Sequence, residues 1–278
     1  MNKKILGIIF TSFLFLLISF RIVHSQTPSA TFDFNKAYQD YVYNTQLYNN
    51  SYSAYQLARS TYLASKTIIA QTNAQVATLD MLQARDQMIM TYLTAIRMRL
   101  RETTGISEGE LQLKYSEIDA DFKWWEDHKT KLASAASLDD LVDDSNEAYD
   151  HYQLTLLLTY QSLSTIFIGR LDSERSDLQR IVSELKNKVA EIKANQNKNT
   201  STIERSLIEV DNRIDRSMSK ESEAKDMVSS MGQDQNNSRE SNDKKFSDVK
   251  TTLRESLAYM NETVTILNQI ILNIKTAD

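Results

Sequence analysis

The chain has 278 residues and a formal net charge of −5, and 41% hydrophobic with 25% charged residues is the balance of an ordinary soluble protein. Acidic residues outnumber basic ones and no basic block occurs, which argues against binding nucleic acid through its phosphates. The absence of cysteine excludes a disulfide framework, thiolate catalysis, cysteine-ligated zinc and iron–sulfur clusters.

The scarcity of glycine and proline points to helices. The chain holds five glycines and one proline. Turns of β-hairpins need residues that tolerate positive φ, and loops favour proline. So few turn-forming residues predict a small number of long elements, and therefore an all-α protein.

The N-terminus has the features of a secretory signal peptide. Lys3 and Lys4 form a positively charged start, residues 5–20 form an apolar stretch, and Ser25 is a small residue at the cleavage point. We expect cleavage before Gln26, so that the protein is exported and is secreted, periplasmic or at the cell surface. The alternative is an uncleaved anchor, although the stretch is shorter than the roughly 20 residues of a helical span.

Residues 34–102 form the first predicted helix. They contain no glycine or proline, and apolar or aromatic side chains recur at steps of three and four residues. This spacing is a heptad seam, typical of a helix that packs along its length. The phase slips near residues 76–82, which predicts a kink or a local change of winding in one long helix.

Four further helices are predicted from capping boxes, in which one side chain accepts a backbone N–H and an acidic residue reaches back. The boxes begin at Ser107, Ser137, Ser201 and Asn237. The helices that follow cover about 108–132, 138–194, 201–231 and 238–274.

The predicted helix lengths divide the chain. Short turns make consecutive helices antiparallel, and the helix from 138 is about twice as long as the one before it. After a signal peptide at 1–25 and a short linker at 26–33, we expect a proximal helical bundle over 34–169 and a distal antiparallel three-helix coiled coil over 170–278. The fold class is an elongated antiparallel bundle or coiled coil of about five long helices.

A stripe of tyrosines is the main candidate for an interaction surface. Tyr41, Tyr48, Tyr55 and Tyr62 recur at intervals of seven residues. Tyrosine combines apolar area with a polar tip, which suits binding of glycans or of a partner helix. The alternative is a seam inside the bundle, where small residues such as Ala58 leave room for the rings.

The 18 residues from Tyr152 to Gly169 carry no charge. Such a segment suits insertion into a membrane, yet its many Ser, Thr and Gln residues do not, and its length is marginal. A helix that is apolar on all sides is typically the most buried helix of a bundle.

No catalytic motif, cofactor site or metal site emerges from the remaining residues. Asp144, Glu147 and His151 share one helix face, which makes a metal site conceivable. The spacing is not that of a calcium loop, and acids early in a helix are favoured by its dipole. The glycosylation pattern, which matters only in a eukaryotic source, occurs at Asn49, Asn199, Asn236 and Asn261.

These observations favour an exported, non-enzymatic scaffold or protein-interaction protein that acts through coiled-coil surfaces and binds a protein partner or itself. An alternative is a membrane-active, pore-forming-like protein that inserts residues 152–169. A weaker alternative is an extracytoplasmic ligand-sensing bundle. Each of them is an analogy at the level of fold class, and fold alone does not give function.

Overall fold

A computed structural model describes residues 32–196, 199–233 and 238–277. Within these ranges the chain is all-helical, as predicted, with six helices and no strand. The predicted signal peptide at 1–25, and nearly all of the linker at 26–33, lie outside the described residues. The helices are α2 (Phe34–Ser65), α3 (Ile68–Arg101), α4 (Glu108–Leu132), α5 (Leu138–Gln196), α6 (Ser201–Ser229) and α7 (Arg239–Ala277).

The first predicted helix is in fact two, so the prediction of about five helices was wrong for the described part of the chain. The break lies not at residues 76–82 but at Lys66, which adopts the left-handed conformation (φ 50°). Thr67 then caps α3, and its hydroxyl accepts the backbone N–H of Ala70 at 3.2 Å. The two heptad seams face each other across this turn, so α2 and α3 form an antiparallel hairpin.

One predicted capping box is present in full, at Ser137, and the one at Ser107 is present only in its hydroxyl half. The Ser107 hydroxyl accepts the N–H of Glu110 at 3.3 Å. At the start of α5, Ser137 and Asp140 cap each other, because each side chain accepts the other residue's backbone N–H. At α6 the prediction was one residue off: Thr200 occupies the N-cap position, without a side-chain bond to a backbone N–H, and Ser201 is the first residue of the helix.

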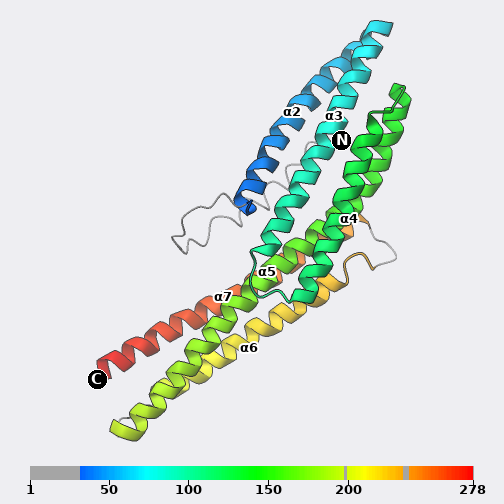
Figure 1. Cartoon of the computed structure of the whole chain (residues 1–278). Coiled ribbons are helices and arrows are strands. Elements are labelled where there is room, and N and C mark those ends of the chain that lie inside the picture. Colours follow the sequence, from blue (N-terminus) through cyan, green and yellow to red (C-terminus); the bar gives the residue numbers. More distant parts are fainter. Residues whose placement is uncertain (1–31, 197–198, 234–237, 278) are drawn as a thin grey trace. The chain divides into compact units, whose positions relative to one another are not determined.

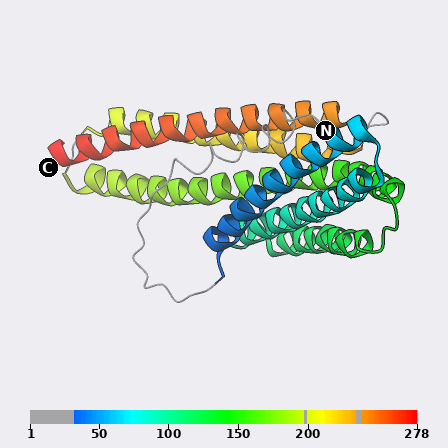
Figure 2. The same ribbon diagram turned by 90° about the horizontal axis from the view of Figure 1, so that it is seen from above.

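The remaining helices are built around α5 (Figure 1, Figure 2). α4 runs antiparallel to α3 and to α5, while α6 returns along α5 and α7 runs back along both. Among the described residues, α6 and α7 contact α5 and each other but none of α2, α3 or α4. α5 is therefore the one element that both groups of helices share.

This arrangement explains why residues 152–169 carry no charge. Thr155, on this segment, bonds to Trp125 of α4, whereas Tyr160 stacks on Phe246 of α7. The segment is thus covered by α4 on one side and by α7 on another. Its buried residues are Thr155, Leu156, Thr159, Tyr160, Ser162, Leu163, Ser164, Thr165, Ile166 and Ile168. No helix in the described ranges is both long and apolar enough to cross a membrane.

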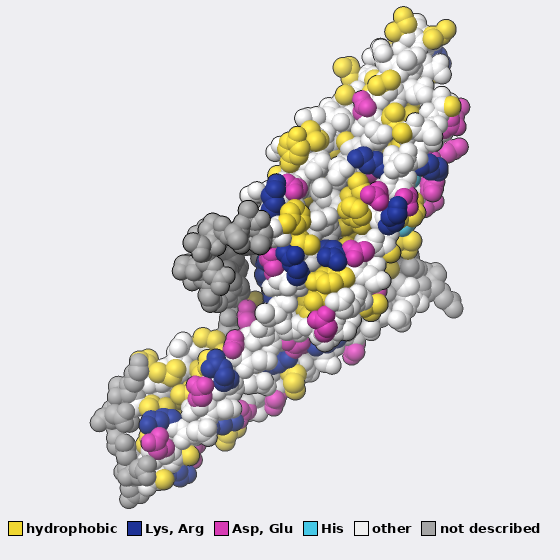
Figure 3. All heavy atoms as spheres, viewed as in Figure 1, with side chains coloured by type: hydrophobic (Ala, Val, Ile, Leu, Met, Phe, Trp, Pro, Cys, Tyr) yellow, Lys and Arg dark blue, Asp and Glu magenta, His cyan; other side chains and the backbone are white. Residues whose placement is uncertain are grey.

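The end of the α2–α3 hairpin is the part with the least packing. α2 has no buried residue after Tyr48, and its only partner helix among the described residues is α3. Hydrophobic side chains are visible on the surface at this end (Figure 3). Closer to the start of α2 the hairpin is packed: Tyr41 of α2 lies against Tyr92 of α3 with ring centroids 5.0 Å apart, and α3 in turn contacts α4 and α5.

Candidate functional site

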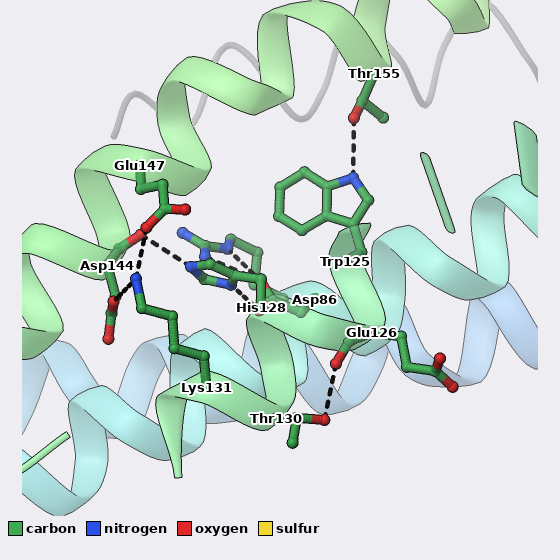
Figure 4. A network of polar contacts seen from close by, with 10 residues as sticks. Asp86, Trp125, Glu126, His128, Thr130, Lys131, Asp144, Glu147 and Thr155 are labelled. Carbon is green, nitrogen blue, oxygen red and sulfur yellow. Dashed lines mark hydrogen bonds and ion pairs between the residues drawn. The ribbon is translucent and has the colours of Figure 1, made fainter. Parts of the chain in front are cut away.

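A buried polar network joins α3, α4 and α5, and His128 is its centre (Figure 4). The His128 ring is almost fully buried. Its Nδ1 lies 2.6 Å from Oδ2 of Asp86 on α3, and its Nε2 lies 3.0 Å from the carbonyl oxygen of Asp144 on α5. One side chain of α4 thereby links the two helices on either side of it.

The partners of His128 define where its protons lie. A carbonyl oxygen only accepts hydrogen bonds, so Nε2 carries a proton. A further proton lies between Nδ1 and the Asp86 carboxyl group. Whether it sits on nitrogen or oxygen, the His128–Asp86 pair has no net charge. A pair of this kind is easier to bury than two separate charges.

Arg85 adds a cation next to the pair. Its Nε donates to Oδ1 of Asp86 at 3.0 Å, and its guanidinium group lies 5.8 Å from the ring centroid of Trp125. Asp86 is completely buried, and both of its oxygens are hydrogen-bonded: Oδ1 accepts from Arg85, and Oδ2 shares a hydrogen bond with His128. Paired and hydrogen-bonded in this way, the carboxylate avoids the large cost of an isolated buried charge.

A second chain of polar contacts begins one turn away. The indole N–H of Trp125 donates to the Thr155 hydroxyl at 2.9 Å, and that hydroxyl donates to Oδ1 of Asp121 at 3.0 Å. The same Asp121 oxygen lies 2.6 Å from Nε2 of His151. Trp124 stacks on the His151 ring with centroids 3.6 Å apart, and it also stacks on the His128 ring. Trp124 therefore connects this second series of polar contacts to the His128 network.

A histidine held by an aspartate is the arrangement that orients a general base in many enzymes. Here, however, both ring nitrogens of His128 bond to atoms of the protein and the ring is buried. The geometry therefore fixes the packing of three helices, because each polar contact is satisfied in only one register.

Asp144, Glu147 and His151, the residues of the conceivable metal site, bond to different partners. Asp144 and Glu147 both accept from Lys131, at 2.8 and 2.6 Å, and these bonds raise the pKa of that lysine. His151 points instead to Asp121. Within the part of the chain that the structure describes, no three His, Cys, Asp or Glu residues gather closely enough to hold a metal ion.

The tyrosine stripe lies partly inside the protein. Tyr41 and Tyr48 of α2 are buried, Tyr41 against Tyr92 of α3, and Tyr55 and Tyr62 are half-buried. Burial raises the pKa of Tyr48 to about 12 and also raises that of Tyr41. The four residues therefore do not share one exposed face, and the interaction surface that they suggested remains a prediction.

A second buried polar cluster lies between α5, α6 and α7. Arg175 of α5 pairs with Glu221 of α6, and Ser256 of α7 donates to Glu221 at 3.3 Å. Ser217 and Ser256 also bond to each other at 2.8 Å. Burial raises the pKa of Glu221, although the neighbouring Arg175 guanidinium acts in the opposite direction. We call Arg175, Ser217, Glu221 and Ser256 the polar layer.

Sequence reasoning found neither cluster as a site. In the sequence, Ser217 and Glu221 interrupt the heptad spacing of apolar residues over 203–231 and carry no other signal, yet both are buried. Asp86 and His128 are 42 residues apart, so no local spacing links them. The sequence held one signal of a buried polar site: Asp86 is a charged residue at a heptad position of the seam, where apolar residues are expected.

The chain was compared with protein-family models, with curated proteins and with solved structures, and none of them matches it.

Proposed function

We propose that the protein is an exported, non-enzymatic helical scaffold that associates with a second copy of itself through the outer face of α7. The geometry of the described helices supports this in two ways. The buried polar groups described above form hydrogen bonds and ion pairs between helices. One long helix, in contrast, has a face that the described residues leave uncovered.

The observation that carries the proposal is the composition of that face. α7 has no charged residue between Glu262 and Lys275. Outside its buried seam it repeats Leu257, Val264 and Ile271 at intervals of seven residues, the middle one 42% exposed and the others half-buried. Such positions beside a coiled-coil seam are usually charged, and apolar residues there are typical of a helix with a further partner.

A second copy fits this face better than a charged partner does. The outer faces of α5 and α6 are rich in exposed ion pairs, such as Arg180–Glu184 and Lys186–Asp211. Between Glu262 and Lys275 the α7 face offers such surfaces no complementary charge. Against its own copy it meets no like-charge repulsion, and a two-fold axis brings the same stripe to both sides of the contact.

Light scattering coupled to size-exclusion chromatography tests this proposal. We expect the purified chain to elute as a dimer and Val264→Glu to elute as a monomer, because the substitution places a charge in the centre of the contact. The matched control is Gln179→Glu, which adds the same charge on the exposed face of α5. A monomeric wild type, or a Val264→Glu variant that dimerises like the wild type, would contradict the proposal.

Export is tested separately, by the intact mass of protein recovered outside the cytoplasm. We expect the chain to begin at Gln26 or within one or two residues of it. A retained Met1 would indicate an anchor, and recovery only in the cytoplasm would refute export.

A further inference from the structure

The end of the α2–α3 hairpin presents apolar side chains on more than one side. Ile68 and Ile69 are 82% and 75% exposed. They are consecutive in α3 and therefore project about 100° apart around the helix. Two exposed leucines at the end of α2 extend the same surface. We call Leu57, Leu63, Ile68 and Ile69 the apolar tip.

The apolar tip lies beyond the neighbouring helices. The turn between α4 and α5 contacts α3 at Gln75, whose side-chain amide donates to the Ala136 carbonyl at 3.1 Å. α3 continues for about two turns past that point, to Ile68. Figure 1 shows the α2–α3 turn reaching past the α4–α5 turn. Only small residues, Ala70 and Ala74, are buried in this stretch of α3.

The charge of this part of the hairpin differs from that of the chain. Between Asp40 and Asp80 there is no acidic residue, and the only charged residues are Arg59 and Lys66. The whole chain, in contrast, has a net charge of −5. We call Arg59 and Lys66 the basic pair. Exposed apolar side chains next to positive charges are complementary to a partner that has an apolar interior beneath an anionic surface.

We propose that the apolar tip docks onto the interface of a lipid bilayer containing anionic lipids, with the basic pair against the phosphates. The exposed apolar residues lie on more than one side of the hairpin. A protein partner covers one face of a helix, whereas a lipid interface surrounds the whole end of a hairpin. Tyr52, Tyr55 and Tyr62 lie on the same hairpin, and half-buried tyrosines of this kind are typical of membrane interfaces. Apolar residues combined with Lys and Arg bind anionic lipid in the same way in interfacial helices.

This surface is distinct from the α7 face, so it goes beyond the self-association proposed above. The two proposals are also tested by independent measurements. Light scattering reports on α7, and vesicle binding reports on the apolar tip. A Val264→Glu monomer that still binds vesicles would show that lipid binding does not depend on the dimer.

Co-sedimentation of the purified chain with vesicles tests the proposal. One set contains phosphatidylcholine alone, and the other contains equal parts of phosphatidylcholine and phosphatidylglycerol. We expect binding to the anionic vesicles that weakens as salt is added. The double variant Ile68→Glu/Ile69→Glu should lose this binding. Its matched control, Gln179→Glu/Ser183→Glu, adds the same two charges to the exposed face of α5 and should bind like the wild type.

The basic pair is tested by Arg59→Gln/Lys66→Gln. Each basic residue near an anionic surface contributes about fivefold to affinity, so removing both should weaken binding to the anionic vesicles by about 30-fold. Circular dichroism identifies any variant that fails to fold. Absence of vesicle binding by the wild type would overturn the proposal, as would full binding by the Ile68→Glu/Ile69→Glu variant. A change in oligomeric state in that variant, with vesicle binding intact, would identify the tip as a contact between copies instead.

Discussion

Gly105 and Gly169 meet backbone to backbone, where the loop between α3 and α4 crosses α5. A Cβ atom on Gly105 would lie 2.0 Å from the carbonyl oxygen of Gly169, far closer than any real contact. Gly105 also has φ +81°, a conformation that side chains disfavour. The two glycines, 64 residues apart, therefore allow α5 to pass directly beneath the loop.

Substitution of Gly169 by alanine should destabilise the protein. The new Cβ would lie 3.0 Å from the Thr104 carbonyl oxygen and 2.5 Å from the Ile106 side chain, so the loop must shift. Overpacking of this kind costs roughly 1–3 kcal/mol, measured as the free energy of unfolding in urea. Gly109→Ala is the control, because nothing lies within 4 Å of its Cβ and alanine favours a helix by about 0.5–1 kcal/mol. Equal effects of the two substitutions would contradict the close crossing.

The His128–Asp86 pair predicts a large effect of Asp86→Ala. The variant leaves the Arg85 cation and the His128 ring without their shared acceptor in the interior. Breaking a buried charged pair in this way typically costs roughly 3–5 kcal/mol. Asp119→Ala, which removes an exposed aspartate from Arg97, should cost at most about 1 kcal/mol. Chemical unfolding compares the two, and a similarly small cost for both would mean that the network does not support the packing.

The polar layer predicts that a double variant is more stable than a single one. Arg175→Leu leaves Glu221 buried without its cation, at a cost of roughly 3–5 kcal/mol. Arg175→Leu/Glu221→Leu removes both charges, and such apolar replacements are often neutral or stabilising. Thermal unfolding of the two variants and the wild type measures the difference. A double variant no more stable than Arg175→Leu would show that the pair contributes beyond charge compensation.

Alkaline pH should weaken the packing of α2 through Tyr48. Its pKa is raised from 10 to about 12 because burial disfavours the phenolate. A raised pKa in the folded state means that this contribution to stability is complete below pH 10 and is lost as the pH rises towards 12. The loss is of the order of 2 kcal/mol. Tyr48→Phe should lower the dependence of the unfolding free energy on pH in this range, and an unchanged slope would contradict the assignment.

The sequence predicted most of the helices because their boundaries depend on local chemistry. The hydroxyl groups of Ser107 and Ser137 cap their helices as expected, each accepting the backbone N–H three residues on. The break at Lys66 escaped prediction because a lysine in the left-handed conformation has no local signature, unlike glycine. That turn is favoured by the packing of α2 on α3, which only the folded chain contains.

Polar residues in the core were harder to interpret than apolar ones. Leu207 and Ile214 lie seven residues apart, a heptad spacing that predicts one inward face of α6, and both are buried. The same pattern marked Glu221 as a weakness, because it could not show that Arg175 lies opposite. The partner of a buried charge comes from another helix, and no spacing within one helix reveals it.

The last prediction concerns the order in which the helices open. Leu207 is buried on α6, a helix that packs on α5 and α7, and replacement of such a leucine by alanine typically costs about 2–5 kcal/mol. Leu185 of α5, which the heptad pattern also assigns to this seam, is only half-buried and is the less sensitive position. Among the described residues α6 contacts neither α3 nor α4, so the loss of packing should stay within α6 and the parts of α5 and α7 beside it.

Hydrogen exchange followed by mass spectrometry measures this directly. In Leu207→Ala we expect faster exchange across residues 175–229, while residues 82–100 of α3 and 155–168 of α5 keep their protection. The reason is that the latter segment is also held by α4, through Thr155 and Trp125. Simultaneous loss of protection in both regions would mean that the chain unfolds as one cooperative bundle, and the predicted division at residue 170 would then be wrong.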